Sequence, residues 1–169
     1  LELDWKEEDT LLKAMVPTAY RGRFARFGTP FNSVLRGQQP GDPKDEAMFE
    51  TCASRWMTVM DDGQSEGLSL ITENKYGVSC REGVIGLSLV RSALVTGERL
   101  GEDGRFLFPE LRDGGERNAY SDQRVHTIRY ALGAWRQDTP RAGQAAVLAD
   151  LLYMPALHAA RPVTAGLKG

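Results

Sequence analysis

The sequence is poor in the residues that build metal sites and disulfide frameworks. Its 169 residues include two cysteines and two histidines: Cys52, Cys80, His126 and His158. None of them stands in the close spacing of a zinc motif, so we expect this chain by itself to hold no metal or other cofactor. Both cysteines fall in predicted strands and are interpreted as buried or half-buried free thiols, although the sequence leaves a disulfide between them open. His126 lies on a strand face and is interpreted as a core or strand-edge residue.

An excess of positive charge and long apolar runs are also missing. The formal net charge is -2 and the pI is about 5.8, so no basic surplus is available to neutralise a phosphate backbone. No apolar run approaches the roughly 20 residues that cross a bilayer, and no signal-peptide pattern is present. We therefore expect neither nucleic acid nor a membrane as a partner. Low cysteine content fits a reducing compartment, and we expect a cytoplasmic, bacterial protein.

Short apolar runs between turn signals indicate an all-β fold. We predict a single antiparallel β-sandwich domain over residues 1–169 with one short C-terminal helix over 139–152. The chain opens inside a strand-like segment, so we expect it to be a fragment of a larger protein. The expected strands are 1–5 and 10–16, joined by a charged hairpin tip at 6–9, then 20–27, 30–35, 47–52, 56–60, 67–72, the two strands of a hairpin within 73–92, and 123–135. Residues 93–122 are rich in glycine and charge and are predicted to be a long loop or insertion.

One predicted hairpin, residues 73–92, organises the rest of the chain. Its turn is Arg81-Glu82-Gly83, and an apolar strand follows. Because side chains alternate along a strand, Arg91 is expected on the same face as three aliphatic residues: Ile85, Leu87 and Leu89. A buried unpaired charge there would cost several kcal/mol, so we expect its guanidinium to reach a carboxylate, a rim or a ligand.

The same residues carry a resemblance to a known family. The pattern Lys75-Tyr76-Gly77, a glycine turn and then Leu87-Ser88-Leu89-x-Arg91-Ser92 resembles the C-terminal β region of glycoside hydrolase family 38, the α-mannosidases. Three further segments resemble this family in the same order along the chain, from residue 3 to 152. They are Leu3-Asp4-Trp5 with 11–17, Asp45 to Glu50 with Arg55-Trp56, and Thr127 to Leu132. The loop 93–122 departs from the family, whose connection there is shorter.

The resemblance implies a portion of a galactose-mutarotase-like supersandwich from a zinc-dependent retaining glycosidase. In that family the zinc ligands and the nucleophilic aspartate belong to an N-terminal catalytic domain, and none of those motifs occurs here. The expected partners are an α-mannoside substrate and the chain's own catalytic domain; self-association into a homo-oligomer stays open. We expect no catalytic residue in this fragment and no activity from it alone. The substrate-binding residue carried over is Arg91, together with Lys75 and Tyr76. The alternative for all three is a purely structural role, for Arg91 as the partner of a nearby carboxylate.

Other readings of the sequence are kept open. Four acidic residues could supply a carboxylate pair: Asp61, Asp62, Glu66 and Glu73. However, Asp61-Asp62-Gly63 reads as a tight turn that uses aspartate for its own backbone. A second function is a free-standing carbohydrate-binding module that stacks sugars on Trp5, Trp56 or Trp135. A third is an interaction domain with a wide apolar face.

Overall fold

The computed structural model describes residues 1–39, 41, 43–47, 49–93, 120–136 and 143–153. Most of the predicted loop 93–122, the predicted helix start at 138–140 and His158 lie outside this part of the chain. The elements are β1 (Glu2–Asp4), β2 (Thr10–Pro17), β3 (Phe24–Thr29), β4 (Asn32–Gly37), α1 (Pro43–Ala47), β5 (Thr51–Cys52), β6 (Trp56–Met60), β7 (Glu66–Thr72), β8 (Gly77–Arg81), β9 (Val84–Ser92), β10 (Val125–Thr127), β11 (Tyr130–Arg136) and α2 (Gly143–Tyr153).

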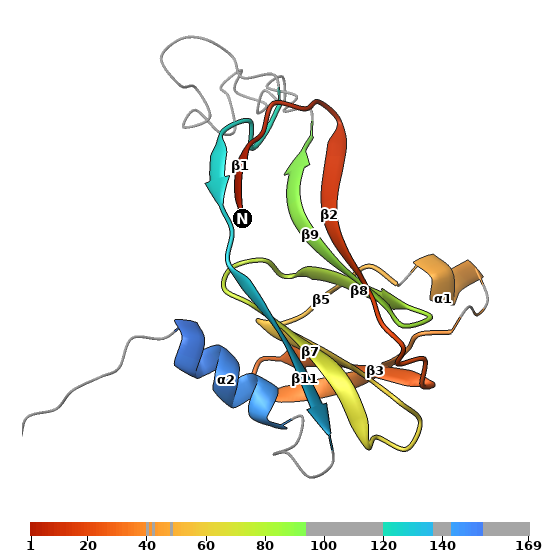
Figure 1. Ribbon diagram of the computed structural model, residues 1–169. Helices are drawn as coiled ribbons and strands as arrows, with labels where there is room; N and C mark the ends of the chain where they lie inside the picture. The colour runs from red at the N-terminus through yellow and green to blue at the C-terminus, as the bar shows by residue number, and fades with distance from the viewer. Residues whose placement is uncertain (40, 42, 48, 94–119, 137–142, 154–169) are drawn as a thin grey trace, which may run out of the picture.

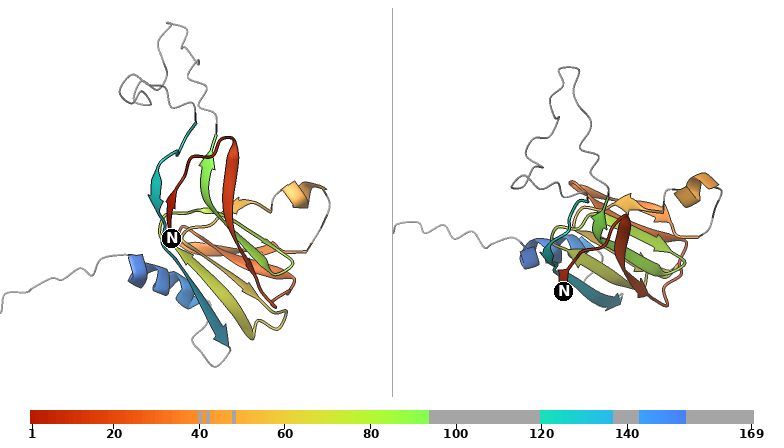
Figure 2. Two further views of the ribbon diagram at one scale, coloured as in Figure 1. Left: turned by 45° about the horizontal axis from the view of Figure 1, so that its top comes forward. Right: turned by 90° about the horizontal axis from the view of Figure 1, so that it is seen from above.

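Two antiparallel sheets pack face to face (Figures 1 and 2). One has five strands in the order β11-β7-β6-β3-β4, and the other has four in the order β2-β9-β8-β5. A separate two-stranded ribbon, β1-β10, lies beside the upper ends of β2 and β9, and α2 covers part of the outer face of the five-stranded sheet. The predicted antiparallel β-sandwich is therefore confirmed. None of the helices in the described ranges is long and apolar enough to cross a bilayer.

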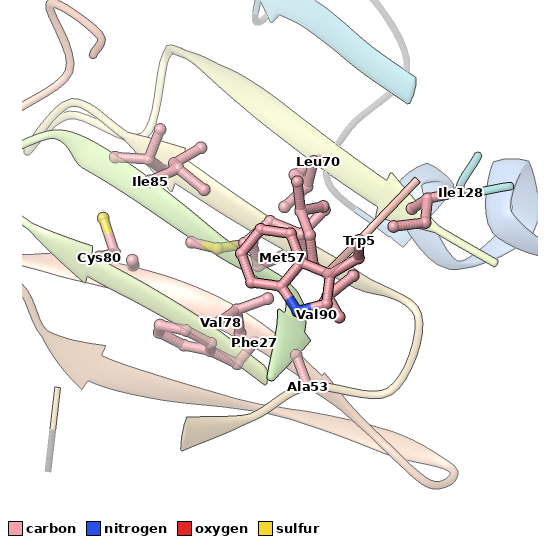
Figure 3. Close-up of a cluster of buried hydrophobic side chains, with 14 residues drawn as sticks. Trp5, Phe27, Ala53, Met57, Leu70, Val78, Cys80, Ile85, Val90 and Ile128 are labelled. Atoms are coloured by element: carbon pink, nitrogen blue, oxygen red, sulfur yellow. The ribbon is translucent and has the colours of Figure 1, made fainter. Parts of the chain in front are cut away.

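The core fills the space between the two sheets (Figure 3). Strands β3, β6 and β7 contribute Phe27, Met57 and Leu70 from one side, and β8 and β9 contribute Val78 and Ile85 from the other. Side-chain alternation explains the placement of these five residues, since every second residue of a strand faces the opposite sheet. Trp5 closes the core where the β1-β10 ribbon joins it, and its indole Nε1 donates to Ser92 Oγ at 3.3 Å.

The two predicted hairpins around residues 56–92 are confirmed. In β8-β9 the residues Arg81 and Val84 face each other, and the loop between them consists of Glu82 and Gly83 with φ values of 48° and 81°. Positive φ at both positions matches the right-handed twist of a two-residue hairpin. A side chain at position 83 would also bring its Cβ within 2.8 Å of the Tyr20 carbonyl oxygen, so glycine is required here for two reasons.

Several predicted boundaries were wrong. Residues 1–16 do not form the expected hairpin, because β1 pairs with β10 and β2 pairs with β9. The strand expected over 123–135 is split into β10 and β11 by the buried Ile128, whose N–H donates to the Leu1 carbonyl at 2.8 Å. The strand expected over 47–52 is only β5, and α1 occupies the residues before it, so the described residues contain a second short helix.

Candidate functional site

Arg91 was predicted to lie on the apolar row of β9, and this prediction was wrong. Leu12 faces Val90 across the β2-β9 ladder while the next residue, Lys13, faces Ser88, so Leu89 has no partner in the ladder. Such a β-bulge inserts one residue into a strand and shifts the side-chain alternation beyond it. Leu89 and Val90 are consequently both buried, and Arg91 is turned outward and exposed.

The end of β9 is fixed by the segment that precedes β10. Ser121 Oγ donates to the Arg91 carbonyl oxygen at 3.1 Å and accepts from the Ala93 N–H at 3.0 Å. The backbone of Arg91 is thus held on one side, while its guanidinium forms no ion pair with any residue of the described ranges. The alternative prediction was that Arg91 pairs with a nearby carboxylate. No carboxylate of the described ranges forms an ion pair with it.

Lys75 and Tyr76 form the corner that leads into β8. The Lys75 N–H donates to Thr72 Oγ1 at 3.2 Å, and the Tyr76 carbonyl accepts from the Ala53 N–H at 2.8 Å. The backbone is therefore well anchored, whereas the Tyr76 side chain is 52% exposed. In the described structure no hydrogen bond joins the side chains of Arg91, Lys75 and Tyr76. The ladder between β8 and β9 stops at Val78, so Arg91 lies well beyond the last paired position.

The acidic residues considered for catalysis are engaged in structural contacts. Glu73 receives both forks of Arg129, from Nε at 2.9 Å and from Nη2, and these bonds hold the pKa of the Glu73 carboxyl below its usual range. Asp61 accepts from the hydroxyl of Ser65 at 2.7 Å and from the N–H groups of Ser65 and Glu66. The serine hydroxyl and these amides lower the pKa of Asp61. The predicted turn role of Asp61 is confirmed.

Asp62 also has a structural role in the loop between β6 and β7. Asp62 Oδ1 accepts from the Arg23 N–H at 2.6 Å, which ties the β6-β7 loop to the start of β3. The residue with positive φ in this loop is Gln64 at 51°, not Gly63. The loop therefore uses both aspartates as acceptors for backbone amides, a role typical of turns.

A groove of about 990 Å³ lies on the outer face of the five-stranded sheet. It was not predicted, because its residues come from β3, β4, β6, β11 and α2 and meet only through the sheet register. Its aromatic members are Phe31, Trp56 and Trp135. Trp56 is buried and lies against Ala145 and Ala149 of α2, whereas Trp135 is half-buried on the edge strand. Register offsets the backbone positions of the two tryptophans by four residues, or about 13 Å, along the strand direction.

Polar groups of this groove include one that is unpaired. Arg55 donates to Asp150 at 2.5 Å and so links the loop before β6 to α2, and Arg26 donates to Ser33 Oγ at 3.2 Å. The indole Nε1 of Trp135 is buried and has no acceptor within the part of the chain that the structure describes. A buried N–H without a partner costs about 1–3 kcal/mol, so this atom marks a place where an outside acceptor would stabilise the protein.

A second groove, of about 640 Å³, lies on the outer face of the four-stranded sheet. Here Lys13 Nζ donates to Glu50 and, at 3.0 Å, to Ser79 Oγ, and Ser88 Oγ donates to Glu50 at 2.6 Å. The lysine fits because position 86 is glycine: a Cβ there would lie 2.5 Å from Ser79 Oγ and 3.0 Å from the Lys13 side chain. The donors and acceptors of this network satisfy one another, so it reads as a structural contact.

The described residues do not assemble a donor set for zinc. No group of three or more His, Cys, Asp or Glu side chains is close enough within them to hold a metal ion. His126 is buried, as predicted, and its Nε2 bonds to the Asp122 carbonyl at 2.7 Å. Both cysteines are free; Cys80 is buried, which raises its pKa to about 12, but Cys52 is exposed, contrary to the prediction.

Comparison with known proteins decides the family. The model of the glycosyl hydrolases family 38 C-terminal domain matches residues 1–98, more than half of the chain. This chain belongs to glycosyl hydrolase family 38. The match covers every residue named in the predicted motif of β8 and β9, so the resemblance seen in the sequence is confirmed at the level of the family.

Curated members of family 38 agree with this assignment. Alpha-mannosidase 2C1 of Homo sapiens is 34% identical over 91 residues, which are 54% of this chain and 9% of that protein. The alpha-mannosidase of Saccharomyces cerevisiae is 28% identical over 140 residues, 80% of this chain and 11% of that protein. This chain thus spans about a tenth of the length of the curated relatives.

Solved structures of family 38 share the fold. The crystal structure of an alpha-mannosidase from Enterococcus faecalis superposes with a TM-score of 0.63 at 17% identity, over 89% of this chain and 15% of that chain. A second Enterococcus faecalis protein of the family gives a TM-score of 0.57 at 18% identity, over 80% of this chain and 14% of that chain. The β-sandwich described above is therefore an architecture found within larger family members.

Proposed function

We propose that this chain is the C-terminal β domain of an α-mannosidase-like retaining glycoside hydrolase. It packs beside a catalytic domain that lies outside this sequence and contributes to the wall of the substrate cleft. The family match over residues 1–98 carries this proposal. The proposed substrate of the parent enzyme is an α-mannoside, and the proposed location of this enzyme is the cytoplasm.

Arg91 is the residue proposed to meet the substrate. The bulge at Leu89 turns its guanidinium away from the core, and no carboxylate of the described ranges neutralises it. An unpaired guanidinium at a strand end offers five N–H donors to sugar hydroxyls or to a carboxylate of the catalytic domain. Tyr76 and Lys75 are proposed to contribute to the same wall from the neighbouring corner, where the tyrosine ring is accessible.

Zinc, which the family resemblance implies, is proposed to belong to the catalytic domain. Within the described ranges no three His, Cys, Asp or Glu side chains lie close enough to share a metal ion, and His126 bonds to a backbone carbonyl. When bound there, the metal supplies Lewis-acid contacts to sugar hydroxyls. The role left for this chain is to position and enclose the substrate, not to transfer protons or form a covalent intermediate.

By itself the chain is proposed to be inactive. Retaining glycosidases need two carboxyl groups about 5 Å apart, and here Glu73 is engaged by Arg129 and Asp61 by Ser65. An assay of the 169-residue chain on an aryl α-mannoside with added zinc should give no turnover above background, whereas the intact enzyme should hydrolyse the same substrate. Turnover by the chain alone would contradict the proposal.

Carbohydrate binding by the outer groove is a second candidate function. The buried Nε1 of Trp135, which has no acceptor among the described residues, favours it. Trp56 and Phe31 line the same groove, and sugars combine apolar ring faces with hydroxyl acceptors. Trp5 is excluded from such a role by its place in the core. Titration with α-mannooligosaccharides, followed by tryptophan fluorescence, should saturate for the wild type and weaken at least tenfold for Trp135→Phe. Equal affinity of the two proteins would reject this candidate.

A further inference from the structure

Helix α2 is apolar on both of its sides. Between Gly143 and Tyr153 it carries one charged residue, Asp150. Its small residues Ala145 and Ala149 pack on Trp56 and Ile71 of the sheet. Its large residues face outward: Val147 is 54% exposed, Leu148 46%, Leu151 72% and Leu152 53%. Alanines that face the core and leucines that face outward are the reverse of a normal surface helix.

A helix that is hydrophobic all round is normally buried on all sides. Since positions three and four apart are neighbours on a helix, Val147, Leu148, Leu151 and Leu152 form one continuous stripe, called here the leucine face. It points away from the sandwich, because its four members are exposed whereas Ala145 and Ala149 of the same helix pack on the sheet. A contiguous exposed apolar patch on a protein surface often marks an interaction site.

We propose that another part of the same polypeptide, outside residues 1–169, packs against the leucine face. This inference rests on the proposed function, since it requires the chain to be one domain of a larger enzyme. The curated relatives are about ten times longer than the matched region, so an enzyme of that kind has ample chain to cover the helix.

Size argues for a tethered occupant over a second copy. A stable interface between separate molecules buries about 800 Å² and roughly 20–30 residues on each partner, whereas the leucine face consists of four side chains. A domain on the same chain is present at an effective concentration near the millimolar range, so a small apolar contact suffices. The Arg55–Asp150 ion pair and the Arg129–Tyr153 ring contact at 5.8 Å hold α2 on the sheet and present its leucine face as a rigid surface.

Cysteine labelling of the intact protein tests the proposal. In a Cys52→Ser background, Leu151→Cys should react with a maleimide at least tenfold more slowly than Leu35→Cys, each rate being divided by that of the denatured protein. Leu35, on the edge strand β4 and 42% exposed, is the matched control. Since Leu151 is the more exposed of the two in this chain, equal or faster labelling at position 151 would overturn the proposal.

Photocrosslinking then identifies the occupant. A photoreactive phenylalanine at position 151 of the intact protein should crosslink to a peptide from outside residues 1–169 of the same molecule. Mixed heavy and light protein separates the alternatives: a crosslink between two molecules, or one confined to residues 1–169, would overturn the proposal. Hydrolysis of an aryl α-mannoside by the same preparation reports on the proposed function independently, so protection at position 151 without activity would contradict the enzyme assignment and leave the covered face in place.

Discussion

Leu89 and Arg91 lie two residues apart on the same strand, yet Leu89 is buried in the core and Arg91 is exposed to solvent. In a regular strand these side chains would share a face. The β-bulge at Leu89 separates them, because it leaves one residue of β9 without a partner on β2. The strand can therefore stay in the core along most of its length and present a charge only at its end, next to the proposed substrate wall.

Gln38 should be among the most sensitive polar residues for stability. It is fully buried, and its Oε1 accepts from the Gly83 N–H at 2.8 Å and from the Cys80 thiol at 3.4 Å. Gln38→Ala would leave the Gly83 amide unsatisfied, which costs about 1–3 kcal/mol of unfolding free energy. Urea denaturation measures this loss. Gln39→Ala, in which the removed amide is exposed, is the control and should change stability by less than about 0.5 kcal/mol.

Gly83 should tolerate no side chain. Gly83→Ala would place a Cβ 2.8 Å from the Tyr20 carbonyl at a φ of 81°, a conformation that alanine adopts only with strain. We expect a loss of more than about 1 kcal/mol of unfolding free energy, by the same urea measurement. Gly37→Ala is the comparison, since a Cβ at position 37 meets nothing within 4 Å. Equal effects at the two glycines would disprove this account of the turn.

The Glu73–Arg129 pair should make stability depend on acid pH. Its hydrogen bonds hold the pKa of Glu73 below the ordinary value of 4.5, so the pair stabilises the fold fully above that pH. The contribution is lost as pH falls through the lower, folded-state pKa. Melting temperatures measured from pH 7 down to pH 2 should therefore fall more steeply for the wild type than for Glu73→Gln. Glu82→Gln at the hairpin tip serves as the control, and an unchanged slope in Glu73→Gln would refute the assignment.

The two thiols should differ sharply in reactivity. Cys52 is exposed, whereas Cys80 is buried with its pKa raised to about 12 and its thiol directed to Gln38. Because the thiolate is the reactive species, only Cys52 should react with a thiol reagent in the native state. Cys80 should react after denaturation. Two reactive thiols under native conditions, or none in Cys52→Ser after denaturation, would contradict this arrangement.

Local signals in the sequence predicted the hairpins, and long-range pairing limited the rest. The turns at Glu82-Gly83 and Asp61-Asp62 depend on neighbouring residues, so they could be read directly. The bulge at Leu89 depends on the ladder with β2, more than 70 residues earlier in the sequence. The wrong prediction of a hairpin at 1–16 arose because β1 pairs with a strand more than 120 residues away. No local pattern encodes either pairing.

The candidate site followed the same division. The family resemblance located Arg91, Lys75 and Tyr76 by local motifs, but their orientation required the register. Tryptophan spacing could not reveal the outer groove, because Trp56 and Trp135 line it from strands that are separated by β7 in the sheet. One local signal was available, the run of apolar residues in α2, because a helix that is hydrophobic on most sides is typical of a buried element.

The most direct test of the account is the steady-state kinetics of Arg91→Ala in the intact enzyme on an aryl α-mannoside. Because the Arg91 side chain is exposed and unpaired among the described residues, we expect the melting temperature to stay unchanged while kcat/KM falls at least tenfold, about 1.4 kcal/mol of transition-state stabilisation. Arg124→Ala, another exposed arginine, should leave kcat/KM at the wild-type value. Wild-type kcat/KM in Arg91→Ala would contradict the claim that this domain lends a residue to the substrate cleft.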